Sequence, residues 1–274
     1  MSDSQAEKAK RFKALHEASG SFIIPNPWDG ATARILERLG YQALATSSGA
    51  CAATFGRRDG QISRDEAMVH SQLIVESTSL PVSADLEKGF GDDPKTVNET
   101  IRMAADVGLV GASIEDATRD PENPLYAFDL AVERVAAAVE AARSLPFPFM
   151  LVARAHNFMG GGSDLDETIK RLQAFEKVGA DVLFAPGLPT IEAVEAVCKS
   201  VSKPVNFMVG IPHLSFSVAE LTAAGVRRIS LATSLHRAAM DGFIEAAKEV
   251  KEQGTFGYVD SSVSSRELAG YLPG

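Results

Sequence analysis

Short apolar runs alternate with longer amphipathic segments along almost the whole chain. The short runs are rich in Val, Ile, Leu, Phe and Ala and have the length of single β-strands. In the longer segments apolar residues recur at steps of three and four, and several of these segments end at Gly, which is typical of helices with one buried face. The expected strands are residues 21–25, 41–46, 81–85, 109–115, 149–154, 181–186, 204–209 and 226–232.

Strands that alternate with helices in this way predict an α/β protein with a TIM-type (β/α)8 barrel. An open doubly wound sheet is the alternative, but no G-x-G-x-x-G turn follows the first strand. The pattern also predicts an N-terminal helix at 5–18 and a C-terminal helical extension, with 255–274 as a tail that packs on a neighbouring subunit or on its own barrel. Because no low-complexity linker interrupts the pattern, we expect one barrel domain over 1–274.

Composition and charge narrow the class of protein. The chain has 274 residues and 45% hydrophobic content, enough to bury one large core. No apolar run approaches the roughly 20 residues that cross a bilayer, and the N-terminus lacks the apolar centre of a signal peptide, so we expect a cytoplasmic protein with no membrane partner. The net charge of −9 argues against a nucleic-acid partner. Two cysteines are too few for a disulfide scaffold.

Acidic residues follow three of the expected strands. They are Asp59, Asp85, Glu87 and Glu115. In a barrel the strand ends and the loops behind them meet at one face, so these carboxylates would repel one another unless a cation held them. Mg²⁺ prefers such oxygen ligands and usually takes one or two carboxylates directly, with waters in its other positions. The sequence therefore predicts a Mg²⁺ site, which Mn²⁺ would also fit.

Other polar residues at the same face indicate what the cation would act on. Arg154 at the end of the fifth strand has a fixed fork of donors that suits a substrate carboxylate or a developing enolate oxygen. The turn at 46–49 offers hydroxyls and backbone N–H groups at an expected helix start, which suits a carboxylate. A metal with free positions can chelate an α-keto or α-hydroxy acid and stabilise the enolate formed when a C–C bond breaks.

Several segments resemble one known superfamily of enzymes. The most specific is the element D-x-[DE]-x-G-[YF]-G at 85–91, followed about one βα unit later by Ile114, Glu115 and Asp116. With FIIPNPWDGATARILERLGYQALATSSG, LVARAHNF and ELTAAGVRRISLATSLHRAAM, these segments span nearly the whole chain and resemble the isocitrate lyase/phosphoenolpyruvate mutase superfamily.

The resemblance implies a barrel enzyme that binds Mg²⁺ and an α-oxocarboxylate, usually as a dimer of dimers in which the last helix is exchanged between neighbours. By position, Asp85 is the principal metal ligand, and Glu87, Glu115 and Asp59 act through water. The residues expected to bind the substrate carboxylate and keto oxygen are Ser47, Ser48, Gly49, Ala50, Arg154 and Asn206. The expected catalytic residues are Arg154, His156 and Ser48.

The loop after the fourth strand departs from the superfamily pattern. Members that cleave isocitrate or methylisocitrate carry K-[KR]-C-G-H there, whereas residues 117–126 hold neither cysteine nor lysine. Phosphonate-handling members have a lysine and an asparagine; Asn123 could match the asparagine only, which makes phosphonopyruvate C–P chemistry the less favoured reaction. Decarboxylation of oxaloacetate and retro-aldol cleavage of a substituted malate remain. The alternative is an α-oxocarboxylate-binding protein with little or no catalysis.

The group that protonates the enolate is open at this stage. The candidates are Tyr126, His156, His213 and His236. His156 lies two residues beyond Arg154 and could instead hydrogen-bond a carboxylate of the metal site, while His236 is expected to be structural. We expect Lys88 to pair with a neighbouring carboxylate such as Glu87 rather than to form a Schiff base. Cys51 is expected to be a small buried helix residue.

Overall fold

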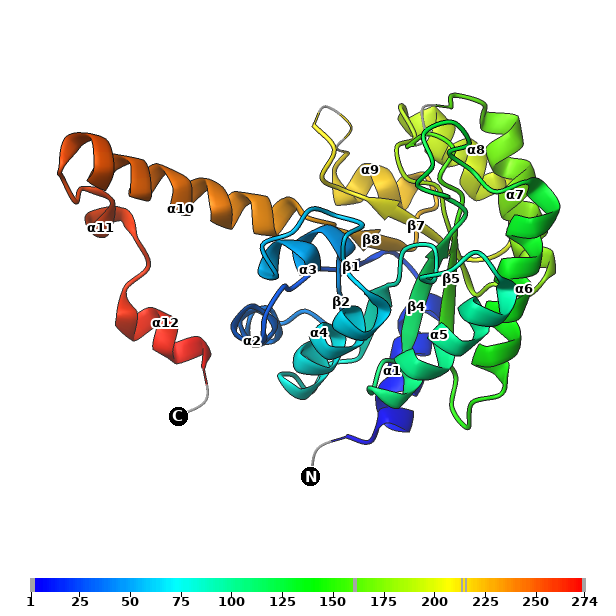
Figure 1. Ribbon diagram of the computed structural model, residues 1–274, viewed down its shortest axis with the longest axis horizontal. Coiled ribbons are helices and arrows are strands. Elements are labelled where there is room, and N and C mark those ends of the chain that lie inside the picture. Colours follow the sequence, from blue (N-terminus) through cyan, green and yellow to red (C-terminus); the bar gives the residue numbers. More distant parts are fainter. Residues whose placement is uncertain (1–2, 160–161, 213, 215, 273–274) are drawn as a thin grey trace.

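Eight parallel strands form a nearly closed TIM-type (β/α)8 barrel, as the hydrophobic pattern predicted (Figure 1). The computed structural model describes residues 3–159, 162–212, 214 and 216–272. In chain order the strands are β1 (Phe22–Ile24), β2 (Leu44–Ala45), β3 (Val82–Asp85), β4 (Gly111–Glu115), β5 (Met150–Arg154), β6 (Val182–Phe184), β7 (Val205–Met208) and β8 (Arg228–Ser230). Their order in the sheet is β1-β8-β7-β6-β5-β4-β3-β2. At the seam between the two end strands, the Ala45 N–H donates to the Pro25 carbonyl at 3.0 Å.

The helices between the strands cover the outside of the barrel (Figure 1). Most begin at a Ser, Thr or Asp whose side chain accepts a hydrogen bond from the first turn, for example Ser63 before α4 and Asp93 before α5. Their bounds are α2 (Gly30–Arg38), α3 (Ser48–Thr54), α4 (Arg64–Glu76), α5 (Pro94–Asp106), α6 (Phe128–Arg143), α7 (Leu165–Lys177), α8 (Ile191–Ser200) and α9 (Val218–Ala223). Their apolar faces pack on the strands and form the larger hydrophobic core.

The first helix, α1 (Gln5–Glu17), closes the base of the barrel. Its Ala9 and Phe12 are 0% exposed and pack with inward-facing strand residues such as Val152 and Val182. Glycine at position 111 makes this contact fit, because a Cβ there would lie 2.9 Å from the Phe12 ring. The barrel is therefore filled by side chains at its base, and only the opposite end carries the polar strand termini.

The C-terminal extension leaves the barrel instead of covering it (Figure 1). Helix α10 (Ser234–Gln253) projects outward, and after α11 (Tyr258–Ser261) the chain turns back so that α12 (Ser265–Tyr271) contacts α2. None of these three helices contains a buried residue, and Phe243 on α10 is 66% exposed. The extension is longer than the tail expected at 255–274, because α10 belongs to it. No helix in the described part of the chain is long and apolar enough to cross a membrane.

Candidate active site

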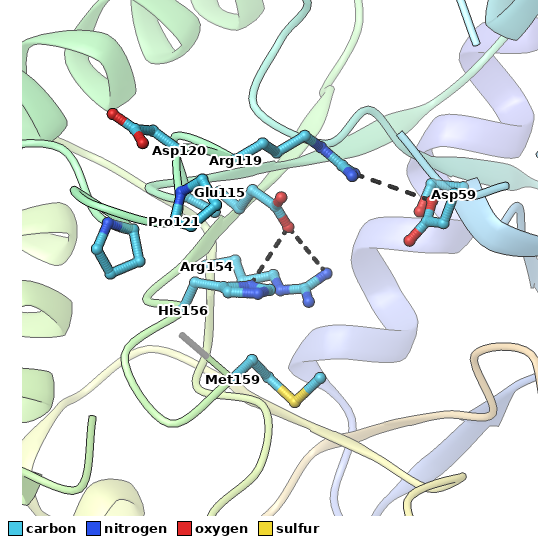
Figure 2. Close-up of a pocket in the computed structure, with 11 residues that line it drawn as sticks. Asp59, Glu115, Arg119, Asp120, Pro121, Arg154, His156 and Met159 are labelled. Atoms are coloured by element: carbon cyan, nitrogen blue, oxygen red, sulfur yellow. Dashed lines mark ion pairs between the residues drawn. The ribbon is translucent and has the colours of Figure 1, made fainter. Parts of the chain in front are cut away.

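A cavity of about 330 Å³ opens at the carboxyl ends of the strands, where a barrel presents its loops (Figure 2). It brings together five of the residues predicted from the sequence, which come from different loops and strands: Ser48, Asp59, Glu115, Arg154 and His156. The loop between β4 and α6 forms another part of its wall through Ala117, Arg119, Asp120, Pro121 and Pro124.

Asp85, at the end of β3, is held by hydrogen bonds rather than by a counter-charge. Its Oδ2 accepts a hydrogen bond from the Ser48 hydroxyl at 3.1 Å, and its Oδ1 accepts one from the Glu87 backbone N–H at 3.2 Å. A longer bond of 3.4 Å comes from the Ser113 hydroxyl on β4. Among the described residues, no ion pair within 4.0 Å involves Asp85. Its carboxylate is therefore fixed in direction but carries no bound cation from the protein.

Glu87 is buried beside Asp85 and pairs with an arginine of the β4 loop. The Arg119 Nη2 lies 2.9 Å from the Glu87 Oε2. Burial raises the pKa of Glu87 to about 7; Arg119 opposes this rise, and the neighbouring carboxylates Asp85, Asp59 and Glu115 add to it. The backbone φ of Glu87 is 52°, a left-handed conformation that is strained for a residue with a Cβ.

Glu115 and Arg154 form the second pair at the site. The Arg154 Nη1 lies 3.1 Å from the Glu115 Oε2, and Figure 2 draws this pair as a dashed line. Burial raises the pKa of Glu115 to about 6, although Arg154 opposes the rise. The Nδ1 of His156 is 3.5 Å from the same carboxylate oxygen, but burial and then Arg154 lower the pKa of His156 to about 3. The imidazole is therefore neutral near pH 7, and this contact is not an ion pair.

Arg119 is a site residue that sequence reasoning missed. Residues 117–126 lack the lysine and cysteine of related enzymes, and Arg119 is the one basic residue among them. The loop forms a small hairpin, in which Ala117 and Leu125 make an isolated antiparallel bridge and the Thr118 N–H donates to the Pro124 carbonyl at 3.0 Å. Figure 2 shows the Arg119 guanidinium pointing from this hairpin toward Asp59.

A smaller chamber of about 50 Å³ lies inside the barrel, next to Asp85 and Arg154. Asn206 faces this chamber rather than the larger cavity, and its Nδ2 donates to the Ser230 hydroxyl at 3.1 Å. Arg228, which the sequence did not indicate, is buried here; burial lowers the pKa of its guanidinium to about 10, and Asp85 opposes that shift. The interior therefore places a second buried cation near Asp85.

The remaining predicted substrate-binding residues lie around the start of α3. Ser47 is its N-cap, and Gly49 and Ala50 lie in its first turn. Ala50 is fully buried. A Cβ at Gly49 would come within 3.0 Å of the Thr233 side chain, which makes glycine the residue that fits between the two loops. Of this group, Ser48 lines the larger cavity and Ser47 lines the inner chamber, whereas Gly49 and Ala50 line neither.

Lys88 is an ion-pair partner, as expected, but its partner is Asp92 and not the adjacent Glu87. Its Nζ lies 2.7 Å from the Asp92 carboxylate, whereas Glu87 pairs with Arg119. The two side chains take different directions: Glu87 is buried, with a left-handed backbone, whereas the Lys88 Nζ reaches Asp92 and also donates to the Thr118 carbonyl at 3.2 Å.

The alternative proton donors lie elsewhere. The Tyr126 hydroxyl donates to Asp92, and Tyr126 does not line either cavity. The His236 ring packs edge-on against Trp28 with 5.2 Å between centroids, as suits a structural residue. His213 lies outside the described residues. Cys51 is buried in α3, as expected.

The donor chemistry of the site suits a hard divalent cation. Within 3–159, 162–212, 214 and 216–272, no group of three or more His, Cys, Asp or Glu side chains stands ready to hold a metal ion. Mg²⁺ does not need such a group, because it usually takes one or two carboxylates directly and keeps several waters. Arg119 pairs with Glu87 and Arg154 pairs with Glu115, whereas no arginine or lysine in the described part of the chain lies within ion-pair distance of Asp85. Asp85, which makes no ion pair with any residue that the structure describes, is the carboxylate that fits as the direct ligand.

The relationship to known proteins follows from the sequence as a whole. The sequence model of the family described as phosphoenolpyruvate phosphomutase matches residues 12–251. The chain belongs to this family. Its motifs were therefore correctly assigned to the isocitrate lyase/phosphoenolpyruvate mutase superfamily.

Solved structures and curated relatives agree with this family. A crystal structure from Burkholderia cenocepacia J2315, provisionally described as a lyase/mutase, is 49% identical, covers 98% of this chain and 97% of its own, and has a TM-score of 0.96. The 2-methylisocitrate lyase of Escherichia coli K12 is 27% identical over 268 residues, or 94% of this chain and 89% of its own. A crystal structure of 2,3-dimethylmalate lyase is 26% identical with a TM-score of 0.86 and covers 96% of this chain and 94% of its own. Of these three relatives, the two whose names state a substrate are lyases.

Proposed function

We propose that the protein is a Mg²⁺-dependent carbon–carbon lyase or decarboxylase that acts on a small α-keto or α-hydroxy dicarboxylate through a metal-stabilised enolate. The two reactions that fit are decarboxylation of oxaloacetate and cleavage of a substituted malate. The observation that carries the proposal is the position of Asp85: at the end of β3 its carboxylate adjoins Arg154 in the inner chamber and makes no ion pair with any described residue. The names of two relatives, 2-methylisocitrate lyase and 2,3-dimethylmalate lyase, support the same reaction class.

The cation is part of the proposal. Asp85 would bind Mg²⁺ directly, and Glu87, Glu115 and Asp59 would contact its waters; Mn²⁺ has the same ligand preference. When bound, the cation supplies the electrophile that chelates the α-oxygen and carboxylate of the substrate and lowers the energy of the enolate.

The protein's own residues would bind and orient the substrate. Arg154 is fixed by its pair with Glu115, and its guanidinium would hold a substrate carboxylate or the enolate oxygen. The Ser48 hydroxyl and the neighbouring Ser47, Gly49 and Ala50 would orient the carboxylate at the start of α3. Asn206, which lines the inner chamber, would bind the substrate from that side. His156, neutral and beside Glu115, would provide an N–H to the site rather than a positive charge.

The proton balance of the simplest reaction defines its test. Oxaloacetate loses CO₂ when its C3–C4 bond breaks, the electron pair forms the pyruvate enolate, and one proton at C3 completes pyruvate. Purified protein would be incubated with oxaloacetate and Mg²⁺, with EDTA and Asp85→Asn as controls. We expect pyruvate release above the rate of Mg²⁺ alone, lost in both controls. A parallel set of 2-alkylated malates tests the retro-aldol reaction.

A binding function without turnover is the second candidate, and the β4 loop favours it. Its residues at the cavity are Ala117, Arg119, Asp120, Pro121 and Pro124, which include neither a thiol nor an amine that could transfer the proton. If no substrate is turned over but α-keto dicarboxylates raise the melting temperature only with Mg²⁺, the protein is a binder. If neither turnover nor Mg²⁺-dependent stabilisation occurs, both functions fail.

We also propose that the protein assembles as a homotetramer, a dimer of dimers, in the cytoplasm. The projecting α10 supports this, because Phe243, Ile244 and Val250 expose apolar side chains to solvent in the single chain. The two free thiols, Cys51 and Cys198, fit a reducing compartment.

A further inference from the structure

Arg119 brings a positive charge from the β4 loop into the group of carboxylates. Its Nη2 lies 2.9 Å from the Glu87 Oε2 and 3.9 Å from the Asp59 Oδ1, and the second contact is drawn in Figure 2. Both carboxylates are among those that the proposed function assigns to the waters of the divalent cation. The guanidinium therefore already offsets negative charge on Glu87 and Asp59 that would attract the cation.

The loop that contains Gly60 leaves space for the Arg119 guanidinium. A Cβ at Gly60 would lie 2.0 Å from the Arg119 Nη1 and 2.7 Å from its Cζ, so the guanidinium fills the space that glycine leaves empty. Two loops that are far apart in sequence thus meet at this one side chain.

The backbone conformation of Arg119 also indicates that contacts hold this residue in place. Its φ of 67° lies in the left-handed region, which costs a residue with a Cβ on the order of 1 kcal/mol or more. Such a conformation persists only when contacts on both sides over-determine it. Here they are the hairpin bonds behind Arg119, including the Asp120 N–H to the Thr118 hydroxyl at 3.0 Å, and the Glu87 pair in front.

A divalent cation at Asp85 would disturb this arrangement. It would attract the oxygens of Glu87 and Asp59 and repel the guanidinium, since both effects act over a few ångströms in a partly buried site. The hairpin at 117–126 would then lose its ionic contact with Glu87. We infer that Arg119 is a positioning residue that competes with the divalent cation for Glu87 and Asp59, weakens cation binding, and couples that binding to the position of the hairpin. The inference rests on the proposed metal site.

Calorimetric titration with Mn²⁺ tests the competition directly. The full-length wild type would be compared with Arg119→Gln, which removes the charge, and Arg119→Lys, which keeps it. Arg57→Gln is the matched control, because Arg57 is an exposed arginine of the neighbouring loop that pairs with Glu66. We expect Arg119→Gln to bind Mn²⁺ at least about fivefold more tightly, a factor that corresponds to about 1 kcal/mol. Arg119→Lys and Arg57→Gln should stay near the wild type.

Limited proteolysis by an enzyme that cuts after acidic residues reports the hairpin without any activity measurement. Glu122 lies in the hairpin, where Arg119 anchors the wild type. We expect Mn²⁺ to increase cleavage there several-fold in the wild type, and Arg119→Gln to be cleaved readily with or without Mn²⁺. Equal cleavage of the two proteins without metal would overturn the anchoring role.

The two hypotheses fail in different ways. If the wild type binds Mn²⁺ and Asp85→Asn does not, but Arg119→Gln binds it equally or more weakly, the metal site stands and the competition is refuted. If the wild type binds no Mn²⁺, the metal site fails and the competition fails with it.

Discussion

Glu115 and Arg154 are register partners on the adjacent strands β4 and β5, and their side chains form an ion pair of 3.1 Å at the edge of the cavity. Their Cα atoms lie side by side in the sheet ladder, so the backbone itself fixes the pair. Glu115 is 6% exposed and Arg154 is 11% exposed at the side chain, which leaves little water to screen either charge. The pair thus holds the guanidinium at the position from which it would meet substrate.

Arg154→Gln should destabilise the fold as well as abolish activity. The change leaves the buried Glu115 carboxylate without its cation, and breaking a buried pair in this way costs about 3 kcal/mol. Urea unfolding monitored by circular dichroism would measure it. Arg143→Gln is the control: it removes an exposed pair with Asp181 and should cost at most about 1 kcal/mol. Adding Glu115→Gln to Arg154→Gln should recover part of the loss; no recovery would show that the charge was not the cause.

Activity should be insensitive to thiol reagents. Burial raises the pKa of Cys51 to about 12 and that of Cys198 to about 11, so neither thiol forms the reactive thiolate at pH 8. Treatment with iodoacetamide under native conditions should leave lyase activity intact, and a thiol-reactive dye should label the protein only slowly. In guanidinium chloride both cysteines should react at once. Rapid inactivation of the native enzyme would contradict the burial of Cys51.

His16 should make the fold less stable as the pH falls. Burial, and then the charges of Arg228 and Arg227, lower the pKa of His16 to about 3, whereas the unfolded chain titrates near 6.5. Below pH 6.5 the unfolded state therefore binds a proton that the native state does not, and stability is lost progressively toward pH 3. This group alone should lower the free energy of unfolding by about 2 kcal/mol between pH 8 and pH 5.

The variant His16→Gln isolates that contribution. Glutamine can still donate to the Phe12 carbonyl, which lies 2.8 Å from the His16 Nδ1, but it does not titrate. Denaturant midpoints of the wild type and variant, measured from pH 8 to pH 5, should converge as the pH falls. Parallel curves would show that His16 titrates alike in the native and unfolded states and that its pKa is not lowered by burial.

Substitution of the exposed apolar face of α10 should change the oligomeric state. Phe243 and Ile244 are 66% and 46% exposed in the single chain, and the double variant Phe243→Glu, Ile244→Glu places charges where a neighbouring subunit would pack. Light scattering after size-exclusion chromatography should show a tetramer for the wild type and a smaller species for the variant. Glu252→Gln, near the end of α10, should behave as the wild type. A monomeric wild type at micromolar concentration would refute the assembly.

The barrel itself was readable from the sequence, because eight apolar runs with helical segments between them leave few other arrangements. Strand lengths were less accurate. The run at 41–46 contributes only Leu44 and Ala45 to the ladder, since those two residues alone have register partners on β3. Apolar character extends beyond the paired residues, so it overestimates the strand.

The sequence predicted only some of the site residues. Residues at strand ends could be predicted, whereas those placed by tertiary structure could not. Asp85, Glu115 and Arg154 follow strands directly, and strand ends meet at one face of a barrel. Arg119 owes its direction to a left-handed backbone and to the gap at Gly60, which are tertiary features. Adjacent strand residues face opposite sides, so one of Arg227 and Arg228 had to point inward, but the sequence does not say which. The structure places Arg228 inside.

The closure of the barrel base by α1 has a kinetic consequence. Phe12 is fully buried at the base, so under the proposed function substrate and products would share the opening beside the β4 hairpin. A product that stays bound in this cavity would prevent the next substrate molecule from binding. Product inhibition should then be competitive with substrate, and the rate of product release would depend on the position of the β4 hairpin at this opening.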